Sequence, residues 1–526
     1  MFTTFHTGQY QPLSWVTLGL DHLLWGMEPF GYHLTSLLLH AACAVLFYFV
    51  TGHLLNLRRS NPIASSGLAV SIAACFGALV FAMHPLRVEP VVWASTRDYL
   101  VSGLFLLWSL LCYLRAVKLP ESHSKWLRCM TASVIIYGLS LLSKPIGITL
   151  PVILLLLDVY YLDRLTGDQG NRFAPVARRV WYEKIPFLLL ALGALALTVV
   201  AQQSSENLSR VDDYDATTRI ALMLYSLAFF LWQTVIPLGL SPLYEWPTHL
   251  DKQSWHIVLG GVMIVTGSVG IFLVRRRWPA GLVSWVSYVL ILLGEAGSIA
   301  GGGEIAADRY TYLACLGWAV LAGAGVLFVW QKWHCGQIFR GAFAVTGLVT
   351  ILLSLGIVTW KQTATWQDSE TLWTSAVRSH PRGTAAREKL ATVLVSQGAL
   401  DKAIENFNKV VEINPNRGDI HFKLGKVWAD LGRFDEAIDH FQRALKIDSS
   451  SAQVHYHLGR ALEARGRLDE AIDHFQQALR IEPEFAEVHV SLGRALSSHG
   501  RYTEAVQHYQ AAIRQLKSRV TEGVKK

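Results

Sequence analysis

The sequence predicts an all-α protein in two parts, a polytopic membrane domain followed by a solenoid of short helical repeats. The chain is 52% apolar and only 16% charged over 526 residues, whereas about 25% charged residues is usual for a soluble domain. The charge is also uneven, because residues 364–526 hold 23 Lys and Arg with 21 Asp and Glu, and the first 363 residues hold only 24 and 18. An internal repeat runs through the second part, with glycine at positions 398, 432, 466 and 500. We therefore expect a membrane domain over 1–363 and a soluble repeat domain from 364 onward.

The first part contains eleven apolar runs that meet or approach the length of a membrane span. A bilayer core of about 30 Å requires about 20 helical residues. Several runs are short, so we expect ten or eleven helices. The runs lie near residues 33–56, 66–84, 98–117, 129–143, 146–162, 184–201, 219–240, 256–274, 281–295, 310–331 and 340–360.

The positions of Lys and Arg predict the topology, because cytoplasmic loops are enriched in both. The basic loops, which we place inside, contain Arg58–Arg59, 115–128, 164–184, Arg275–Arg277, and Lys332 with Arg340. The outer segments are then 1–32, 84–98, Ser143–Pro145, 202–255 and 294–309. The run 219–240 breaks this alternation, so we expect it to be re-entrant, in-plane or bent. The chain should then leave the membrane after residue 360 on the outer side.

Four kinds of position recur at equal spacing in the second part. They are the glycines 398, 432, 466 and 500, the alanines 403, 437, 471 and 505, the Leu-Gly pairs at 424, 458 and 492, and the aromatic residues 407, 441, 475 and 509. This pattern resembles the tetratricopeptide repeat (TPR), in which small residues let two helices cross closely and an aromatic residue fills the gap between units. We expect a partial unit over 366–383, full units over 384–417, 418–451, 452–485 and 486–519, and a basic tail over 520–526. The resemblance implies a groove for a peptide or protein partner and no chemistry.

Charge and histidine patterns exclude two other functions for this chain. The net charge of +8 divides into about +6 and +2 between the two parts, and the charges of the second part are mixed in sign. Nucleic-acid binding requires a concentrated basic face, so we expect no nucleic-acid partner. Two histidine columns, 421/455/489 and 440/474/508, follow from repeat copying, and we predict no metal ligands among them.

Three polar clusters fall in the predicted outer loops, where a simple membrane anchor would not need them. They are His84–Tyr99, Ser143-Lys144-Pro145, and Glu304 with Asp308-Arg309-Tyr310-Thr311-Tyr312. Single residues of this kind are often interfacial anchors or helix caps. Three clusters on one face instead indicate a substrate or ion path, because ionisable groups at membrane depth are expensive.

These clusters, in this order and followed by TPRs, resemble the transmembrane and tetratricopeptide-repeat O-mannosyltransferases and their bacterial relatives, of the GT-C class of polytopic glycosyltransferases. The matching segments are Tyr10-Gln11-Pro12-Leu13, Tyr32-His33-Leu34, Leu39-His40-Ala41, 84–98, Ser143-Lys144-Pro145 and Asp308–Tyr312. The resemblance implies transfer of a mannose-like sugar from a polyprenyl-phosphate donor to a protein acceptor. It also implies a bacterial inner-membrane protein with the TPRs on the non-cytoplasmic side.

The resemblance assigns roles to individual residues. An acceptor hydroxyl needs a carboxylate as general base, and a phosphate leaving group needs cations. Glu89 and Asp98 would be the catalytic acids. The substrate-binding residues would be His84, Arg97, Lys144, Arg309, Tyr310 and Tyr312, with Arg309 the best phosphate partner because of its planar fork. No metal-ligand motif is visible in the sequence, but two outer acids could share a divalent metal, so the need for a metal stays open.

One departure from the family leaves alternatives open. Enzymes of this class carry a first helix and an acidic loop ahead of the Tyr10–Leu13 segment, and here Met1 stands just before that segment. Either the chain is part of a longer gene product, or it has lost its principal base and serves as a membrane-anchored TPR scaffold for envelope assembly. A transporter is a third alternative, indicated weakly by the glycine-rich stretch 294–303.

Overall fold

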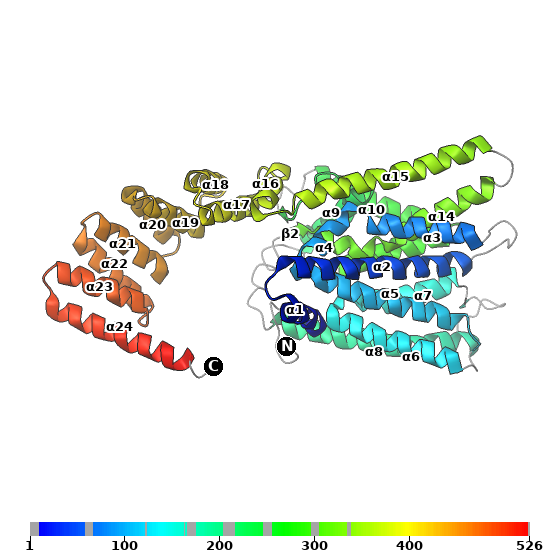
Figure 1. Cartoon of the computed structure of the whole chain (residues 1–526), viewed down its shortest axis with the longest axis horizontal. Coiled ribbons are helices and arrows are strands. Elements are labelled where there is room, and N and C mark those ends of the chain that lie inside the picture. The colour runs from blue at the N-terminus through cyan, green and yellow to red at the C-terminus, as the bar shows by residue number, and fades with distance from the viewer. Residues whose placement is uncertain are drawn as a thin grey trace. The chain divides into compact units, whose positions relative to one another are not determined.

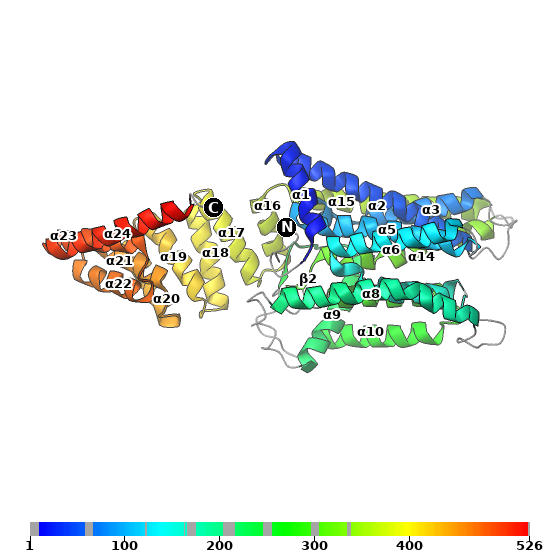
Figure 2. The same ribbon diagram turned by 90° about the horizontal axis from the view of Figure 1, so that it is seen from below.

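The computed structural model describes residues 10–57, 67–120, 124–162, 164–165, 175–203, 216–245, 255–295, 304–333 and 338–523. The chain divides into two compact units, Met1–Gln367 and Asp368–Lys526. Both units are helical, as the sequence predicts, and a two-stranded ribbon in the first unit is the β-structure of the described residues. Figures 1 and 2 show each unit in two views.

The first unit is a bundle of long helices joined at one end by short helical turns. Proline begins several of them, as at Pro12, Pro85, Pro145 and Pro279, where the missing N–H costs nothing. The elements are α1 (Pro12–Trp25), α2 (Pro29–Leu57), α3 (Gly67–Ala82), η1 (Pro85–Arg87), α4 (Val88–Val92), η2 (Ala94–Thr96), α5 (Arg97–Val117), α6 (Ser124–Ser143), η3 (Pro145–Thr149), α7 (Leu150–Leu156), the π-helix η4 (Leu157–Tyr161), α8 (Pro175–Gln203), α9 (Ala216–Val235), β1 (Tyr244–Glu245), α10 (Trp255–Leu273), α11 (Pro279–Gly294), β2 (Glu304–Ala306), η6 (Asp308–Tyr310), α13 (Thr311–Ala314), α14 (Leu316–Trp333) and α15 (Ile338–Ala364).

The chain is a multi-pass membrane protein. Within the described residues, seven helices are long and apolar enough to cross a bilayer, and nine if each of two bent helix pairs forms one span. Two shorter apolar helices cover Pro145–Tyr161 and Pro279–Gly294. The expected total of ten or eleven spans stays a prediction. Segment 219–240, for which we expected a re-entrant, in-plane or bent course, forms for most of its length one continuous helix, α9, which is long enough to cross.

Small residues let the helices of the bundle pack closely. A Cβ added at Gly77 of α3 would lie 2.8 Å from the carbonyl oxygen of Ala319, and one at Gly323 of α14 would lie 2.6 Å from that of Ala73. Neither α3 nor α14 could approach the other this closely with a larger residue at these positions. This is the usual basis of helix association in membranes, where no hydrophobic driving force acts between helices.

Serine hydroxyls join α5 to α6. Ser109 Oγ donates to the carbonyl of Ser133 at 2.7 Å, and Ser133 Oγ donates back to that of Ser109 at 2.8 Å. Nearer the start of α5, Ser140 Oγ donates to the Ser102 carbonyl at 2.9 Å. These hydroxyls are therefore satisfied inside the bundle, as an apolar surrounding requires.

Two helices bend at the same end of the first unit. The axis turns by 60° between α3 and the η1–α4 segment, and by 53° between the η6–α13 segment and α14. Proline at position 85 explains the first bend, because it cannot continue the hydrogen-bond ladder of α3. Figure 1 shows α1, α4 and β2 at this end, which carries the candidate site.

The second unit is a solenoid of antiparallel helix pairs, which confirms the predicted fold class. Its helices are α16 (Ser369–Ser379), α17 (Thr384–Ser396), α18 (Leu400–Ile413), α19 (Gly418–Asp430), α20 (Phe434–Ile447), α21 (Ala452–Ala464), α22 (Leu468–Ile481), α23 (Ala486–Ser498) and α24 (Tyr502–Gly523). Residues 520–523, predicted to begin a tail, continue α24, and residues 524–526 lie outside the described part.

The recurring residues perform the same task in each repeat. The turn glycines 398, 432, 466 and 500 have φ between 73° and 82°, which side chains with a Cβ rarely adopt. A Cβ on Gly459 would lie 2.7 Å from the Phe475 ring of the same repeat. The aromatic residue thus packs inside its own repeat as well as against the next one, where the Phe441 ring stacks on His457 at 6.0 Å. We had expected only the contact between units.

Candidate functional site

The polar end of the membrane unit gathers the three sequence clusters around short helical turns. The first cluster occupies η1, α4, η2 and the start of α5, while η6 and α13 carry most of the third. Lys144, between α6 and η3, brings in the second. Most of the polar side chains on these turns are buried, so they face into the bundle and not away from it.

Glu89 and Arg309 form a buried ion pair between residues that are 220 positions apart. Arg309 Nη1 lies 2.5 Å from Glu89 Oε1, and the Arg309 backbone N–H donates to Glu89 Oε2 at 3.1 Å. The guanidinium also lies over the rings of Trp93 and Tyr310, at 5.8 and 5.0 Å from their centroids. The Glu89 side chain is 1% exposed and that of Arg309 is 16% exposed. Glu89 therefore holds the Arg309 guanidinium in place, and part of the Arg309 side chain stays accessible to a ligand.

Asp98 and Lys144 form the second ion pair. Lys144 Nζ lies 2.6 Å from Asp98 Oδ2 and 3.9 Å from the centroid of the Tyr99 ring. The other carboxylate oxygen of Asp98 accepts from the backbone N–H of Tyr99 at 3.0 Å. Asp98 thus holds an ammonium over an aromatic face at the start of α5, an arrangement that favours a cation in a partly desolvated place.

Glu295, which we did not select from the sequence, lies beside this pair. It is 4% exposed and accepts a hydrogen bond from Tyr99 Oη at 3.2 Å. Burial raises the pKa of the Glu295 carboxyl, Asp98 adds to this effect, and Lys144 and Arg309 oppose it. The same interactions place Glu295 within electrostatic range of both ion pairs. In the sequence, Glu295 stands directly after an apolar run, and this position alone does not distinguish it from an interfacial residue.

Arg97, predicted to bind substrate, does not join this group. Its Nη1 lies 2.5 Å from Asp21 Oδ2, its Nε donates to Ser36 Oγ at 3.2 Å, and its Nη2 donates to the Tyr32 carbonyl at 2.8 Å. The side chain is fully buried. Arg97 therefore links α1, α2 and α5, and its donors are used in packing the bundle.

His84 and Tyr312 also have structural partners. His84 Nε2 donates to the carbonyl of Thr234 at 3.0 Å, so its Nδ1 is the acceptor that caps η1 through the Leu86 N–H at 3.3 Å. Tyr312 is fully buried, and its hydroxyl hydrogen-bonds to His40 Nδ1 at 2.9 Å. Tyr310, the other predicted lining residue, packs its ring against Arg309.

Arg87 is a buried cation of the first cluster that we did not assign to the site. It is 2% exposed, its Nη1 donates to Thr311 Oγ1 at 3.3 Å, and its Nε has no partner within the described structure. No carboxylate of the described residues lies within ion-pair distance of it. The guanidinium instead lies over the rings of Phe81 and Tyr312, at 5.2 and 5.4 Å from their centroids.

Arg87 lines a largely apolar cavity of about 260 Å³. The other lining residues come mainly from α3, α9 and α14, and they are mostly apolar: Val80, Phe81, His84, Leu231, Thr234, Val235, Cys315, Trp318 and Ala319. One cation in the wall of a largely apolar cavity suits an amphiphile with an anionic head.

The described side chains of the site do not form a set of metal ligands. Among the described residues, no group of three or more His, Cys, Asp or Glu side chains is placed to hold one. Glu89 and Asp98, two acids of the predicted outer loops, each face a cation. The residues present therefore do not fit a shared metal between these two acids.

Comparison with known proteins gives matches in both units. Residues 391–432, 414–452, 422–484 and 456–518 match two family models described as tetratricopeptide repeat and TPR repeat. The crystal structure of MamA is similar to the repeats, with 24% identity and a TM-score of 0.28, covering 29% of this chain and 89% of that one.

Longer matches are to proteins named protein O-mannosyl-transferase. TMTC3 of Mus musculus is 24% identical over 436 residues, covering 77% of this chain and 44% of that protein. Tmtc1 of Drosophila melanogaster is 24% identical over 494 residues, covering 79% and 55%. Xenopus laevis tmtc2 is 32% identical over 196 residues, covering 36% and 22%. The chain spans about half the length of the curated relatives it matches over most of its own length.

Proposed function

Because the chain is a relative of the transmembrane and tetratricopeptide-repeat O-mannosyltransferases, we propose that it transfers a mannose-like sugar from a polyprenyl-phosphate donor to a hydroxyl of a protein acceptor. The observation that carries the proposal is the placement of Arg87, a buried cation without a carboxylate partner in the described residues, in the wall of a largely apolar cavity. Arg309 and Lys144 add two cations at the same end of the unit.

The transfer needs a proton acceptor and a stabilised leaving group. The acceptor oxygen attacks the anomeric carbon as its proton passes to a carboxylate. The bond between that carbon and the phosphate oxygen breaks, and the polyprenyl phosphate leaves with the electron pair. We assign the proton to Glu295, because burial raises the pKa of its carboxyl and Tyr99 fixes one of its oxygens. The leaving phosphate is assigned to Arg87, Arg309 and Lys144.

Glu89 and Asp98, which we first predicted to be the catalytic acids, have a different role in this proposal. Each is bound to a cation in the structure, so neither presents a free carboxylate. They hold Arg309 and Lys144 in place until a donor phosphate competes for the same cations. They are positioning residues, and their loss should affect donor binding more than proton transfer.

The TPR array recruits the protein acceptor on the side of the membrane where the site opens. Support comes from the last helix of the membrane unit, which ends at the polar end. Thr359 Oγ1 donates to the Met83 carbonyl at 2.6 Å, and the Trp366 ring lies 5.7 Å from that of Trp93. The chain therefore leaves the membrane unit beside the site. With the basic loops inside, this is the non-cytoplasmic side, and in a bacterium the outer face of the inner membrane.

The test uses the full-length protein in vesicles with radiolabelled polyprenyl-phosphate mannose, measuring mannose transferred to protein. We expect Glu295→Gln to lower kcat by about 100-fold or more, as loss of a general base does. Arg87→Gln should raise the KM for the donor. Glu28→Gln and Lys361→Ala, at exposed positions in the described structure, are the matched controls and should transfer normally. Transfer by Glu295→Gln at the wild-type rate would remove that residue from the mechanism.

The alternative is a TPR scaffold without transferase activity. Two features are compatible with a scaffold. The TPR array is ordered, and Arg309 and Lys144 are already bound to carboxylates. Partner capture that needs only residues 364–526, with no sugar transfer by the wild-type protein from any polyprenyl-phosphate sugar, would favour the scaffold. Transfer that fails when the array is deleted would favour the enzyme.

A further inference from the structure

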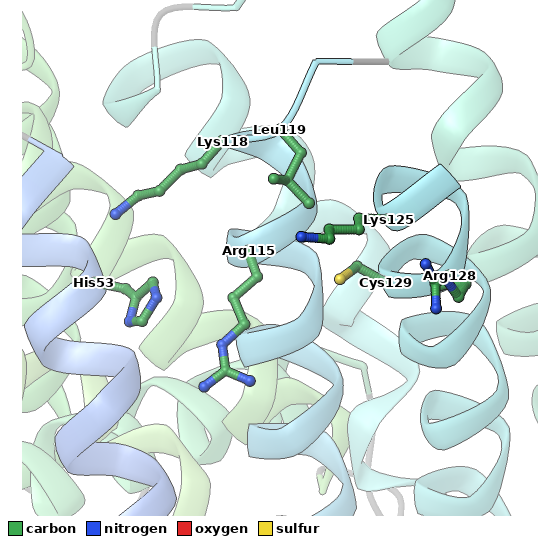
Figure 3. A pocket seen from close by; sticks show the side chains of 7 residues that line it. All are labelled: His53, Arg115, Lys118, Leu119, Lys125, Arg128 and Cys129. Carbon is green, nitrogen blue, oxygen red and sulfur yellow. The ribbon is translucent and has the colours of Figure 1, made fainter. Parts of the chain in front are cut away.

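A basic hollow lies at the end of the membrane unit opposite to the candidate site. Its volume is about 440 Å³, and His53, Arg115, Lys118, Lys125 and Arg128 line it together with Leu119 and Cys129 (Figure 3). Three helices contribute, since His53 is near the end of α2, Arg115 is in the last turn of α5, and Lys125 and Arg128 are in the first turns of α6. His53 is distant in sequence from the other four basic residues, which lie at the end of α5 and the start of α6, and all five line the same hollow.

The hollow is far from the site along α5. Arg97 and Asp98 begin this helix and Arg115 belongs to its last turn, so about 18 residues, or roughly 27 Å, separate the two regions. This distance is close to the thickness of a bilayer core. The hollow therefore lies at the other membrane surface, at the ends of three candidate spans, Pro29–Leu57, Ala94–Val117 and Ser124–Ser143.

Arg115 and Lys118 of this hollow differ from the buried basic residues of the membrane unit. Arg164 lies 3.1 Å from Asp158 and 2.9 Å from Glu183, and Lys184 Nζ lies 2.6 Å from Asp158. These buried cations are neutralised by carboxylates, as burial requires. Arg115 and Lys118 are exposed and have no carboxylate within ion-pair distance in the described part of the chain, and the residues that line the hollow include no acidic side chain from that part.

A surplus of positive charge at this membrane surface is expected from the positive-inside rule, but the rule does not explain a hollow. Nor does the positive-inside rule explain why basic residues from three helices line the same hollow. Partial burial lowers the pKa of the Lys118 ammonium, and an anion beside it would favour its charged form. Arg128 is held toward its own helix by Ser124 Oγ at 3.4 Å.

We propose that this hollow binds the phosphate of an anionic glycerophospholipid headgroup in the cytoplasmic leaflet. The lipid source is favoured over free phosphate because apolar surface adjoins the cations. Leu119 and Cys129 line the hollow beside the cations. Basic recesses between transmembrane helices commonly hold such headgroups. The site is independent of the proposed transfer reaction.

The test is native mass spectrometry of the purified full-length protein titrated with phosphatidylglycerol, and with phosphatidylcholine of the same acyl chains. We expect Arg115→Gln/Lys118→Gln to weaken phosphatidylglycerol binding by about 30-fold, at about 1 kcal/mol for each charge. The matched control is Arg276→Gln/Arg277→Gln, which removes the same charge from another exposed position of the same predicted surface. The control should bind phosphatidylglycerol as the wild type does.

Three outcomes would overturn the proposal. Equal losses of phosphatidylglycerol affinity in the two double variants would show that the lipid responds to general surface charge and not to this hollow. Equal binding of phosphatidylcholine would remove the role of the anionic headgroup. Displacement of the lipid by millimolar inorganic phosphate alone would identify a site for free phosphate. Size-exclusion profiles and helical content, compared across the variants, show that each has folded.

Discussion

Arg97 illustrates how a residue that looks like a ligand-binding cation in sequence can be part of the packing. It belongs to a polar motif, but its partner Asp21 lies far earlier in the chain and on another helix. The sequence shows neither the distance nor the direction between the two. In the folded protein the pair is buried, and removing one partner would leave an uncompensated charge.

We therefore expect Arg97→Gln to destabilise the membrane unit by about 3–5 kcal/mol, because the buried Asp21 carboxyl would lose its partner. The measurement is the thermal unfolding temperature of the full-length protein in detergent. Arg97→Gln/Asp21→Asn should recover part of the loss. If Arg97→Gln unfolds at the wild-type temperature but fails to bind donor, the residue belongs to the site after all.

The glycine at the crossing point of each repeat gives a second prediction at this scale. Because a Cβ on Gly459 would lie 2.7 Å from the Phe475 ring, Gly459→Ala should destabilise the array by about 1–3 kcal/mol, the usual cost of overpacking. Gly459→Ala/Phe475→Leu should recover stability relative to the sum of the single variants. Strict additivity of the two changes in urea unfolding would show that the ring is not the obstacle.

At the scale of elements, each of three successive repeats joins its two helices through a pair of histidines. The Nδ1 atoms are 3.1 Å apart in His421–His440, 3.0 Å in His455–His474 and 2.9 Å in His489–His508. His421 Nε2 donates to the Pro415 carbonyl, so its Nδ1 accepts from His440. Such a bond requires at least one neutral ring, and protonation of both rings replaces it with repulsion.

This arrangement predicts that the array loses stability in mild acid. Burial, followed by the charge of His421, lowers the pKa of His440 from 6.5 to about 4. The unfolded chain therefore binds protons first as the pH falls, and stability is lost progressively between about pH 7 and 4. We expect on the order of 1 kcal/mol for each pair, since the rings are partly exposed.

The measurement is the unfolding temperature of full-length protein and of residues 368–526 by circular dichroism from pH 8 to 4. His440→Gln/His474→Gln/His508→Gln should flatten the curve between pH 6.5 and 5, where carboxylates contribute little. A curve of unchanged shape in this triple variant would assign the loss of stability to other groups, such as His457, whose pKa burial also lowers to about 4.

At the scale of the whole molecule, the parts that follow from local pattern were predictable from sequence and the parts that depend on distant pairing were not. The repeat period and the apolar runs define helices, because both depend on neighbours in sequence. Glu89 and Arg309 were both selected, yet the ion pair that joins these two distant positions was not foreseen. Glu295 and Arg87 were left out, because burial without a carboxylate or cation partner is visible only after folding.

The array should also tolerate the loss of a complete repeat. Deletion of residues 452–485 joins α20 to α23 with the same apolar faces that α21 presents, so we expect a folded array with a lower unfolding temperature. Deletion of 452–468 removes one helix of a pair and leaves an apolar face uncovered. Similar helical content and cooperativity for the two deletions would contradict the repeat as the unit of folding.

The four turn glycines at equal spacing have a consequence for how such a chain can change over time. A duplication or loss of one whole repeat preserves every turn and every helix crossing, while an insertion of any other length breaks the phase. Recombination can thus lengthen or shorten the array in fixed steps without a compensating change in the membrane helices. The length of the array and the sequence of the membrane unit can therefore change independently within one gene.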